Sequence, residues 1–477
     1  MNRYGDDGSH EPMKRSFHIP HIYAILFIFI GLAAIATWIV PAGTFERIPG
    51  PEGRTTIDPA SYQRVEASPV GLTDFLLAVP RGLVSAAEVV FFTLLIGGMF
   101  AVLRRTGIIE IGVDQLTRRF ARRSLWVIPV LMVLFGVIST LIGTQELSLV
   151  YVPVILPLMI ALRFDSVTAA AVALCATTAG FAAGVLNPIN TGLGQQLADL
   201  PLYSGVGLRL AALVLMLGVA IFWVLRYARR VRDTPPEGLV YDDPLEQEKR
   251  KRYQHALDSR PTRASGRQKL ATVTALAFFA ALVYGVLAKG WFMAEMSGLF
   301  IMMGIAVGLV AGLRIDDICE GFNEGFRDVL AGAMIAGIAR AVAVVLEQGQ
   351  VLDTMVHGLG ALVGGMPDAL SALGMYLAQL GFNFVVPSGS GQALVTMPLM
   401  APLADLVGVT RQTAVLAYQL GDGAGNILYP TSGYFMATLA LAGVPWQQWV
   451  RFFLPLFGLW VAIAVALLLF AQASGWQ

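Results

Sequence analysis

Charged residues are scarce in this sequence. Asp, Glu, Lys and Arg make up 14% of its 477 residues, whereas about 25% is usual in soluble proteins. Hydrophobic residues account for 56%, and several uncharged apolar runs approach the ~20 residues that a helix needs to cross a bilayer. The scarcity of charge excludes an ordinary soluble domain, and the apolar runs predict an all-α polytopic membrane protein.

The residues and motifs of common membrane enzymes are missing as well. The two cysteines, Cys175 and Cys319, lie in or beside predicted spans and imply no disulfide framework. There is no G-x-x-x-x-G-K-[ST] phosphate loop and no H-E-x-x-H motif, which argues against an ATP-driven motor and a metalloprotease. We therefore expect no enzyme activity, no cofactor and no nucleic-acid partner.

Clusters of arginine set the expected topology. A first span is predicted at about 20–40 and a second at about 82–103, and four arginines follow between positions 118 and 123. Such clusters mark the cytoplasmic face of a membrane. The polar tail at 1–19 is then cytoplasmic, and the polar loop at 41–80 is external. We expect a multi-pass protein of a bacterial-type cytoplasmic (inner) membrane.

A hydrophilic linker at 229–268 divides the chain into a first half, 20–228, and a second half, 269–477. The linker is rich in charge and has no apolar periodicity, so we interpret it as a cytoplasmic connector and not as a domain. Later spans are predicted at about 270–288, 297–313, 328–347 and 450–470.

Polar residues interrupt the apolar segments of the first half at two places. The segment 124–162 has two apolar arms of about 13–18 residues around a polar tip at 143–148, and arms of this length are short for a span. Both arms end at arginines, so we predict a re-entrant hairpin that enters from the cytoplasmic side. A broken helix is predicted at 166–200, interrupted at Asn187–Gly192.

The second half repeats this pattern. An outer hairpin is predicted at 369–406 with its tip at Ser388–Gln392, and a broken helix at 410–440 that breaks near Pro430. The segments 152–158 and 397–403 align with paired prolines, which disfavours chance similarity between apolar segments. The crossings predict an inverted repeat whose four polar breaks meet near the bilayer midplane, as in many secondary transporters.

Interrupted helices expose N–H groups that favour anions and C=O groups that coordinate cations. Amide and hydroxyl side chains at the breaks can donate or accept, and glycines let backbone approach a ligand. Small residues also serve helix packing, which is the competing explanation for any single Gly or Ser. The predicted substrate- and ion-binding residues are Thr144, Glu146, Asn187, Pro188, Asn190, Thr191, Ser388, Gly389, Ser390, Gly391, Gln392, Asp422, Asn426, Thr431 and Ser432.

Charged residues within predicted spans are costly and therefore functional candidates. Glu146 and Asp422 could carry a proton, bind a cation or meet an amino group, with purely structural pairing as the alternative. Arg340 could pair with an internal acid or with a substrate carboxylate. Glu88 and Asp405 lie near element ends and are expected to be solvated. No metal site is assigned beyond a Na⁺ that the hairpin tips could coordinate.

At these motifs the sequence resembles a known family, the YfcC/arginine–ornithine antiporter-like carriers, which are related to the anaerobic C4-dicarboxylate carriers. The matching segments are 41–45, 187–205, 383–433 and 443–446. The resemblance implies the ion-transporter-superfamily fold, a scaffold domain with a transport domain, elevator-type transport and a homodimer. One departure is that Gln145 precedes Glu146, where the family usually has two adjacent acids.

A secondary active transporter of small amino acids, including basic amino acid antiport, is the function predicted from the breaks and the resemblance together. The acids favour a cationic substrate or cation coupling, whereas Arg340 and the helix N-termini favour carboxylates, and an amino acid satisfies both. A C4-dicarboxylate or other carboxylate carrier is the alternative, and a channel or membrane sensor is a weaker one. The coupling ion is H⁺ or Na⁺, and neither is distinguished by the sequence.

Overall fold

The computed structural model describes residues 22–51, 55–120, 123–253 and 264–477, and within them the chain is almost entirely helical. Nine of the described helices are long and apolar enough to cross a membrane. Four short strands lie among the described residues of the loop after the first helix, and they form two antiparallel pairs. These pairs are β1 (Gly43–Thr44) with β4 (Gln63–Arg64), and β2 (Arg47–Pro49) with β3 (Thr55–Ile57).

One group of helices, here called the scaffold layer, packs around a single long helix. Its members are α1 (Ile22–Ile39), α2 (Leu72–Ser85), α3 (Ala87–Thr106), α11 (Gly266–Lys289), α12 (Met293–Ala311) and α13 (Ile315–Gln348). The 34-residue α13 runs along α1, α2 and α3. A side chain at Gly325 would collide with the backbone of Gly97 and Gly98, so glycine allows the close helix contact typical of membrane proteins.

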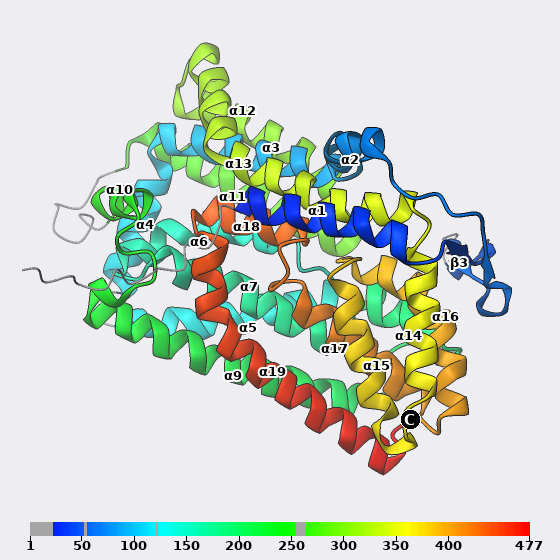
Figure 1. Ribbon diagram of the computed structural model, residues 1–477. Coiled ribbons are helices and arrows are strands. Elements are labelled where there is room, and N and C mark those ends of the chain that lie inside the picture. The colour runs from blue at the N-terminus through cyan, green and yellow to red at the C-terminus, as the bar shows by residue number, and fades with distance from the viewer. Residues whose placement is uncertain (1–21, 52–54, 121–122, 254–263) are drawn as a thin grey trace, which may run out of the picture.

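The second group, here called the hairpin layer, lies beneath the first in Figure 1. Its members are α5 (Ser124–Ile142), α6 (Ser148–Ala161), α7 (Ser166–Ala183), α8 (Leu193–Leu197), α9 (Val206–Asp233), α15 (Asp368–Asn383), α16 (Gly389–Leu406), α17 (Arg411–Gly425), α18 (Gly433–Ala442) and α19 (Trp446–Ser474). The layers meet where α18 packs against α13 and α3.

Helix α7 is the centre of the hairpin layer, because every one of its 18 residues is buried. It is rich in alanine, the best helix former, and small side chains let α5, α9 and α17 pack closely on it. Asp165 caps its start by accepting a hydrogen bond from Thr168 N. Gly184 ends it with φ +55°, a left-handed conformation that glycine adopts without steric cost. The helix therefore stops directly before the break at Asn187.

Three shorter helices connect the layers: α4 (Ile108–Phe120), α10 (Pro244–Tyr253) and α14 (Leu352–Gly364). Over its described residues, the linker that contains α10 is not simply a solvated connector. Glu246 and Arg250 on α10 are buried, and α10 packs against α6. The charge-rich composition gave no sign of this burial.

Several predicted boundaries need correction, although the order of segments is retained. Helix α2 occupies positions 72–85, so the predicted external loop ends before position 80 and not at it. The predicted span at 328–347 is only the second part of α13. Helix α5 has 19 residues and is long enough to span a bilayer, so a re-entrant hairpin at 124–162 stays a prediction. The tail at 1–19 lies outside the described residues.

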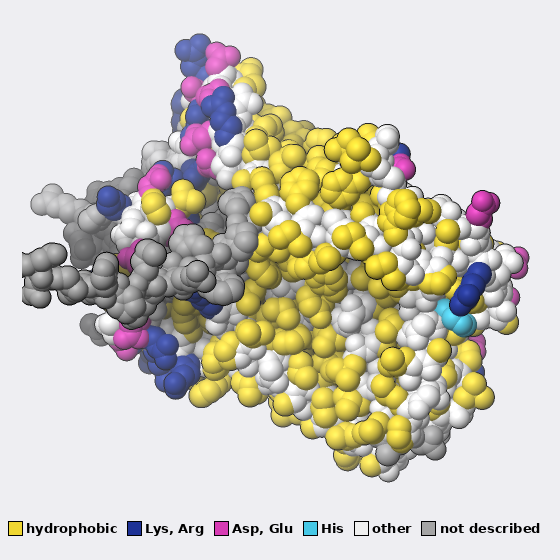
Figure 2. All heavy atoms as spheres, in the orientation of Figure 1, with side chains coloured by type: hydrophobic (Ala, Val, Ile, Leu, Met, Phe, Trp, Pro, Cys, Tyr) yellow, Lys and Arg dark blue, Asp and Glu magenta, His cyan; other side chains and the backbone are white. Residues whose placement is uncertain are grey.

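The surface supports a membrane location. Figure 2 shows hydrophobic side chains over the middle of the visible face, while Lys, Arg, Asp and Glu lie towards its two ends and at the tip formed by α12 and α13. On α1, the large apolar residues Ile28, Leu32 and Ile35 are all exposed. A contiguous apolar surface of this kind is costly in water and suits the hydrocarbon core of a bilayer. The protein is therefore a multi-pass membrane protein.

Candidate functional site

A cavity of about 320 Å³ lies where the two layers meet, and all four predicted breaks reach it or pack directly behind it. Eight of the predicted site residues line this cavity, here called the central cavity. They are Thr144, Glu146, Asn190, Ser388, Gly389, Ser390, Asn426 and Thr431. The other seven, Asn187, Pro188, Thr191, Gly391, Gln392, Asp422 and Ser432, lie outside its lining. All of these except the exposed Pro188 and the half-buried Gly391 are buried.

The turn between α5 and α6 brings an acid to the central cavity. Gly143 ends α5 with φ +81°, which turns the chain sharply. The Ser139 hydroxyl secures the turn by donating to Thr144 O at 2.9 Å and to Thr177 O at 2.7 Å. The Thr144 hydroxyl donates to Glu146, and Glu146 N donates back to it at 3.2 Å. Glu146 is thus held, half-buried, at the cavity wall.

The break after α7 is organised by two asparagines. Asn187 caps the π-helix η4 (Pro188–Gly192) by accepting from Asn190 N at 2.9 Å. Pro188 occupies the first helical position, where its missing N–H costs nothing. Asn190 Nδ2 donates to Gly143 O at 3.2 Å, so this break and the hairpin turn are fastened to each other.

In the second half, Asn383 is the hub of a buried polar network. Its Nδ2 donates to Asp422 Oδ1 at 2.8 Å, to Asn426 Oδ1 at 3.1 Å and to Gln392 Oε1 at 3.2 Å. A Cβ atom added at Gly389 would lie 2.9 Å from Asp422 Oδ2. Glycine at the start of α16 therefore allows the hairpin tip to lie directly against Asp422.

The two halves are also tied to each other. Gln145 Nε2 donates to Gly423 O at 3.2 Å, and the Tyr434 hydroxyl donates to Gln145 Oε1. Gln419 Nε2 donates to Phe181 O at 2.6 Å. Gln145 stands where the family resemblance implies an acid, and a carboxylate could not donate to the Gly423 carbonyl. The departure at position 145 thus has a structural use here.

Replacing Gln145 with Glu is expected to destabilise the contact between Gln145 and the Gly423 carbonyl. The Gly423 carbonyl would lose its donor and face a carboxylate, a loss of about 1–3 kcal/mol for a buried polar group. We expect a lower midpoint of thermal unfolding for purified protein in detergent. Gln63→Glu, the same change at an exposed position, serves as the control. An unchanged midpoint for Gln145→Glu would remove the structural explanation of the departure.

Two charged residues outside the set of predicted site residues also line the central cavity. Glu88, expected to be solvated, lies in its wall, as does Arg340. Arg340 donates to Ser85 Oγ at 3.1 Å and pairs with Glu347 at 3.3 Å. The acid that pairs with Arg340 is the exposed Glu347 and not an internal one, and Arg340 lines the cavity as well. Only the position of Glu88 at the start of a span could have suggested its place in the cavity wall, where its side chain stays exposed.

Several buried polar atoms behind the cavity lack a hydrogen-bond partner within the described part of the chain. They are Asn187 Nδ2, Thr191 Oγ1, Asn383 Oδ1, Asp422 Oδ2 and Ser432 Oγ. Such atoms are costly unless a ligand, ion or water satisfies them, and they include both donors and acceptors. Among the described residues, no three His, Cys, Asp or Glu side chains gather as a metal site. The arrangement can bind a small polar solute that carries both signs of charge.

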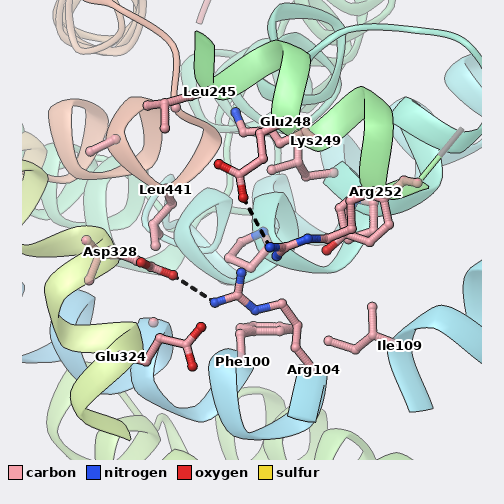
Figure 3. A pocket seen from close by; sticks show the side chains of 18 residues that line it. Phe100, Arg104, Ile109, Leu245, Glu248, Lys249, Arg252, Glu324, Asp328 and Leu441 are labelled. Atoms are coloured by element: carbon pink, nitrogen blue, oxygen red, sulfur yellow. Dashed lines mark hydrogen bonds and ion pairs between the residues drawn. The ribbon is translucent and has the colours of Figure 1, made fainter. Parts of the chain in front are cut away.

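A second cavity, of about 340 Å³, lies at the arginine-rich end of the molecule and is here called the linker cavity. The scaffold layer lines one side, α6 and α18 line another, and α10 closes it. Figure 3 shows two ion pairs facing the cavity, Arg104 with Asp328 from the scaffold layer and Arg252 with Glu248 from α10. Their separations are 2.8 and 3.2 Å. Nothing in the sequence suggested this cavity.

Comparison with known proteins gives matches over nearly the whole chain. The family model DcuC, described as the C4-dicarboxylate anaerobic carrier, matches residues 19–473. A protein of Escherichia coli K12 named putative basic amino acid antiporter YfcC is 32% identical over 97% of this chain and 98% of its own length. An uncharacterized protein of Haemophilus influenzae is 29% identical over the same shares. The solved structure of Neisseria gonorrhoeae MtrF, from a class of antimetabolite efflux pumps, covers 95% of each chain at 16% identity and TM-score 0.41.

Proposed function

Since this chain belongs to the DcuC family of C4-dicarboxylate anaerobic carriers, we propose that it is a secondary active transporter of small amino acids, with basic amino acid exchange as the first candidate activity. The observation that carries the proposal is the central cavity, where four interrupted segments from both halves converge. Such interruptions are tolerated at membrane depth where they line a cavity. Neither an enzyme nor a purely structural membrane protein requires interrupted segments that line a cavity.

The charges around the central cavity favour an amino acid. Glu88 and Glu146 line it, and Asp422 lies directly behind the second hairpin tip. These acids suit an α-ammonium group and a cationic side chain. Arg340 and the N-terminus of α16, which begins at Gly389, suit an α-carboxylate. A basic amino acid uses both sets of groups, and the name of the Escherichia coli relative agrees with this choice.

A C4-dicarboxylate carrier is the second candidate, and the description of the family favours it. The cavity is less suited to a dianion, because Glu88 and Glu146 would repel it and Arg340 is the one Lys or Arg side chain that lines the described cavity. Asp422 and the unpartnered oxygens near it could bind the coupling ion, H⁺ or Na⁺. If the coupling ion is Na⁺, the hairpin tips, of which the second lies against Asp422, would contribute to its coordination.

We further propose an elevator mechanism in an inner membrane, with the N-terminus cytoplasmic and the protein acting as a homodimer. The moving transport unit includes the inner and outer hairpins and the broken helices, at about 124–200 and 369–440. The scaffold and hairpin layers support this division, because each packs mainly within itself. Helices α9 and α19 pack on α5, α7, α15 and α17, so we assign them to the transport unit as well.

A counterflow experiment tests the proposed function. Purified protein in liposomes is preloaded with unlabelled arginine, lysine, ornithine, serine or succinate, and entry of the matching labelled solute is followed. We expect saturable counterflow with at least one basic amino acid and weaker flux with succinate. Counterflow with succinate alone would favour the dicarboxylate alternative, and unsaturable flux would indicate a channel. Protein-free liposomes are the control.

A further inference from the structure

Helix α10 buries charge against the hairpin layer. Glu246 is fully buried; its Oε1 accepts from Ser166 N at 3.3 Å, and its Oε2 accepts from the Ser166 hydroxyl. Lys249 Nζ donates to Ser166 Oγ at 2.9 Å and to Ala442 O at 2.6 Å. Arg250 Nε donates to Glu246 Oε1 at 3.3 Å. One short helix thus contacts residues from both halves.

The two residues that α10 contacts are the ends of two helices. Ser166 is the first residue of α7, and Ala442 is the last residue of α18. Helix starts present unpaired N–H groups and helix ends present unpaired C=O groups. The Glu246 carboxylate therefore meets the positive end of α7, and the Lys249 ammonium meets the negative end of α18. Both interactions have the favourable sign.

The opposite ends of these helices adjoin the central cavity. Helix α7 finishes shortly before Asn187, and α18 begins directly after Ser432. Tyr434, near the start of α18, donates to Gln145 at the first hairpin turn. A change at the α10 end can therefore tilt both helices and move the groups around the cavity.

Burial makes this arrangement costly. It raises the pKa of Glu246 and lowers the pKa of Lys249, and in both cases burial is the largest cause of the change. Removal of one partner leaves the other charge buried and incompletely compensated. A connector whose only task was to join two halves would not need buried charges.

On its other side, α10 faces the linker cavity and not a packed scaffold surface. The ion pair Arg252–Glu248 lies within α10, and Arg104–Asp328 lies within the scaffold layer. Among the described residues, no ion pair links α10 to the scaffold layer. The charges of α10 and of the scaffold layer are paired within each group, so α10 can move away from the scaffold layer without breaking an ion pair between them.

We propose that α10 is part of the transport unit, and that Glu246 and Lys249 are positioning residues which hold α7 and α18 in the geometry that binds the solute. This inference rests on the proposed function. It adds that α10 holds the ends of α7 and α18 and moves together with them.

The first test compares two lysines of α10. Lys249→Met removes the ammonium group from the Ala442 carbonyl, while Lys251→Met makes the same change at an exposed position. For Lys249→Met we expect the half-saturating concentration of labelled L-arginine in counterflow to rise at least about fivefold, the order expected for a lost charged hydrogen bond. We expect less than a twofold change for Lys251→Met and partial recovery in Lys249→Arg.

These outcomes separate positioning from mere stability. A purely structural role would lower the amount of folded protein and leave half-saturation of the remainder unchanged, and that result would overturn the proposal. If Lys249→Met does not fold, Glu246→Gln replaces it, because the amide keeps the shape and an acceptor for Ser166. If the unaltered protein shows no counterflow with any solute of the panel, the proposed function itself is wrong.

The second test tethers α10 with a flexible bis-maleimide in a Cys319→Ser background. Leu245→Cys with Leu441→Cys would link α10 to α18, and Glu248→Cys with Glu324→Cys would link α10 to α13, since all four residues line the linker cavity. We expect the first tether to leave uptake within about twofold, because it joins two helices of the same unit. We expect the second tether to reduce uptake by about tenfold, because it would restrain the motion between the two units that transport requires. Full uptake with the second tether would show that α10 does not move against the scaffold. The four single-cysteine variants are the controls.

Discussion

Replacing Asp422 with Asn is expected to abolish concentrative uptake while the protein stays folded. Asparagine keeps an oxygen that can accept from Asn383 Nδ2 and Asn426 Nδ2, which lie 2.8 and 3.3 Å from Asp422 Oδ1. The change therefore removes the charge but not the shape of the network. Loss of a buried charge that binds the coupling ion or an ammonium group is worth about 3 kcal/mol, or about 100-fold in uptake.

The measurement is initial uptake of labelled L-arginine into proteoliposomes, corrected for the amount of folded protein. Asp316→Asn is the matched control, because Asp316 is an exposed carboxylate at the start of α13. Uptake within twofold of the unaltered protein would mean that Asp422 is only a structural member of the network. Retained exchange with lost accumulation would instead assign Asp422 to ion coupling.

Replacing Asn187 with Ala is the second change with a large expected effect. Alanine removes Asn187 Oδ1, which caps η4 by accepting a hydrogen bond from Asn190 N at 2.9 Å. Without this cap Asn190 is less well held against Gly143 O, and the first break is loosened from the hairpin turn. We expect uptake to fall by roughly 10- to 100-fold, since a lost cap costs about 1–2 kcal/mol and the misplaced groups add to it.

Ser390→Ala provides an independent test of the same site. Ser390 lines the central cavity from α16, so its loss should weaken solute binding with little effect on stability. Asn323→Ala, at an exposed position of α13, controls for the chemical change at Asn187. Normal uptake by both Asn187→Ala and Ser390→Ala would refute the assignment of the site.

Much of the helical order could be predicted because glycine, proline and polar clusters punctuate the sequence. The chain turns at Gly143 and Ser388, within the segments where the hairpin tips were predicted. Backbone that is interrupted inside an apolar segment is rare enough to be recognised from sequence. Whether the halves are mirror-related in the membrane, and whether 124–162 and 369–406 are re-entrant, stays a prediction.

The side chains that complete the site could not be predicted in the same way. The sequence suggested Arg340 as a partner for a substrate carboxylate, whereas Glu88 was expected only to be solvated. Both come from the scaffold layer, and the packing of α2, α3 and α13 brings them to the central cavity. Helical periodicity gives the face on which a residue lies, but not which neighbouring helix that face meets. Tyr434 and Gln145 illustrate this, since neither residue type nor spacing indicated their contact.

The burial of α10 has a practical consequence for labelling this protein. A hydrophilic stretch between two halves is normally the first choice for inserting a fluorescent domain or an affinity tag. Here positions 244–253 are occupied by α10, and an insertion there would pull Lys249 from the Ala442 carbonyl and Glu246 from Ser166. A fusion that reports faithfully on the native protein has to leave those ten residues intact.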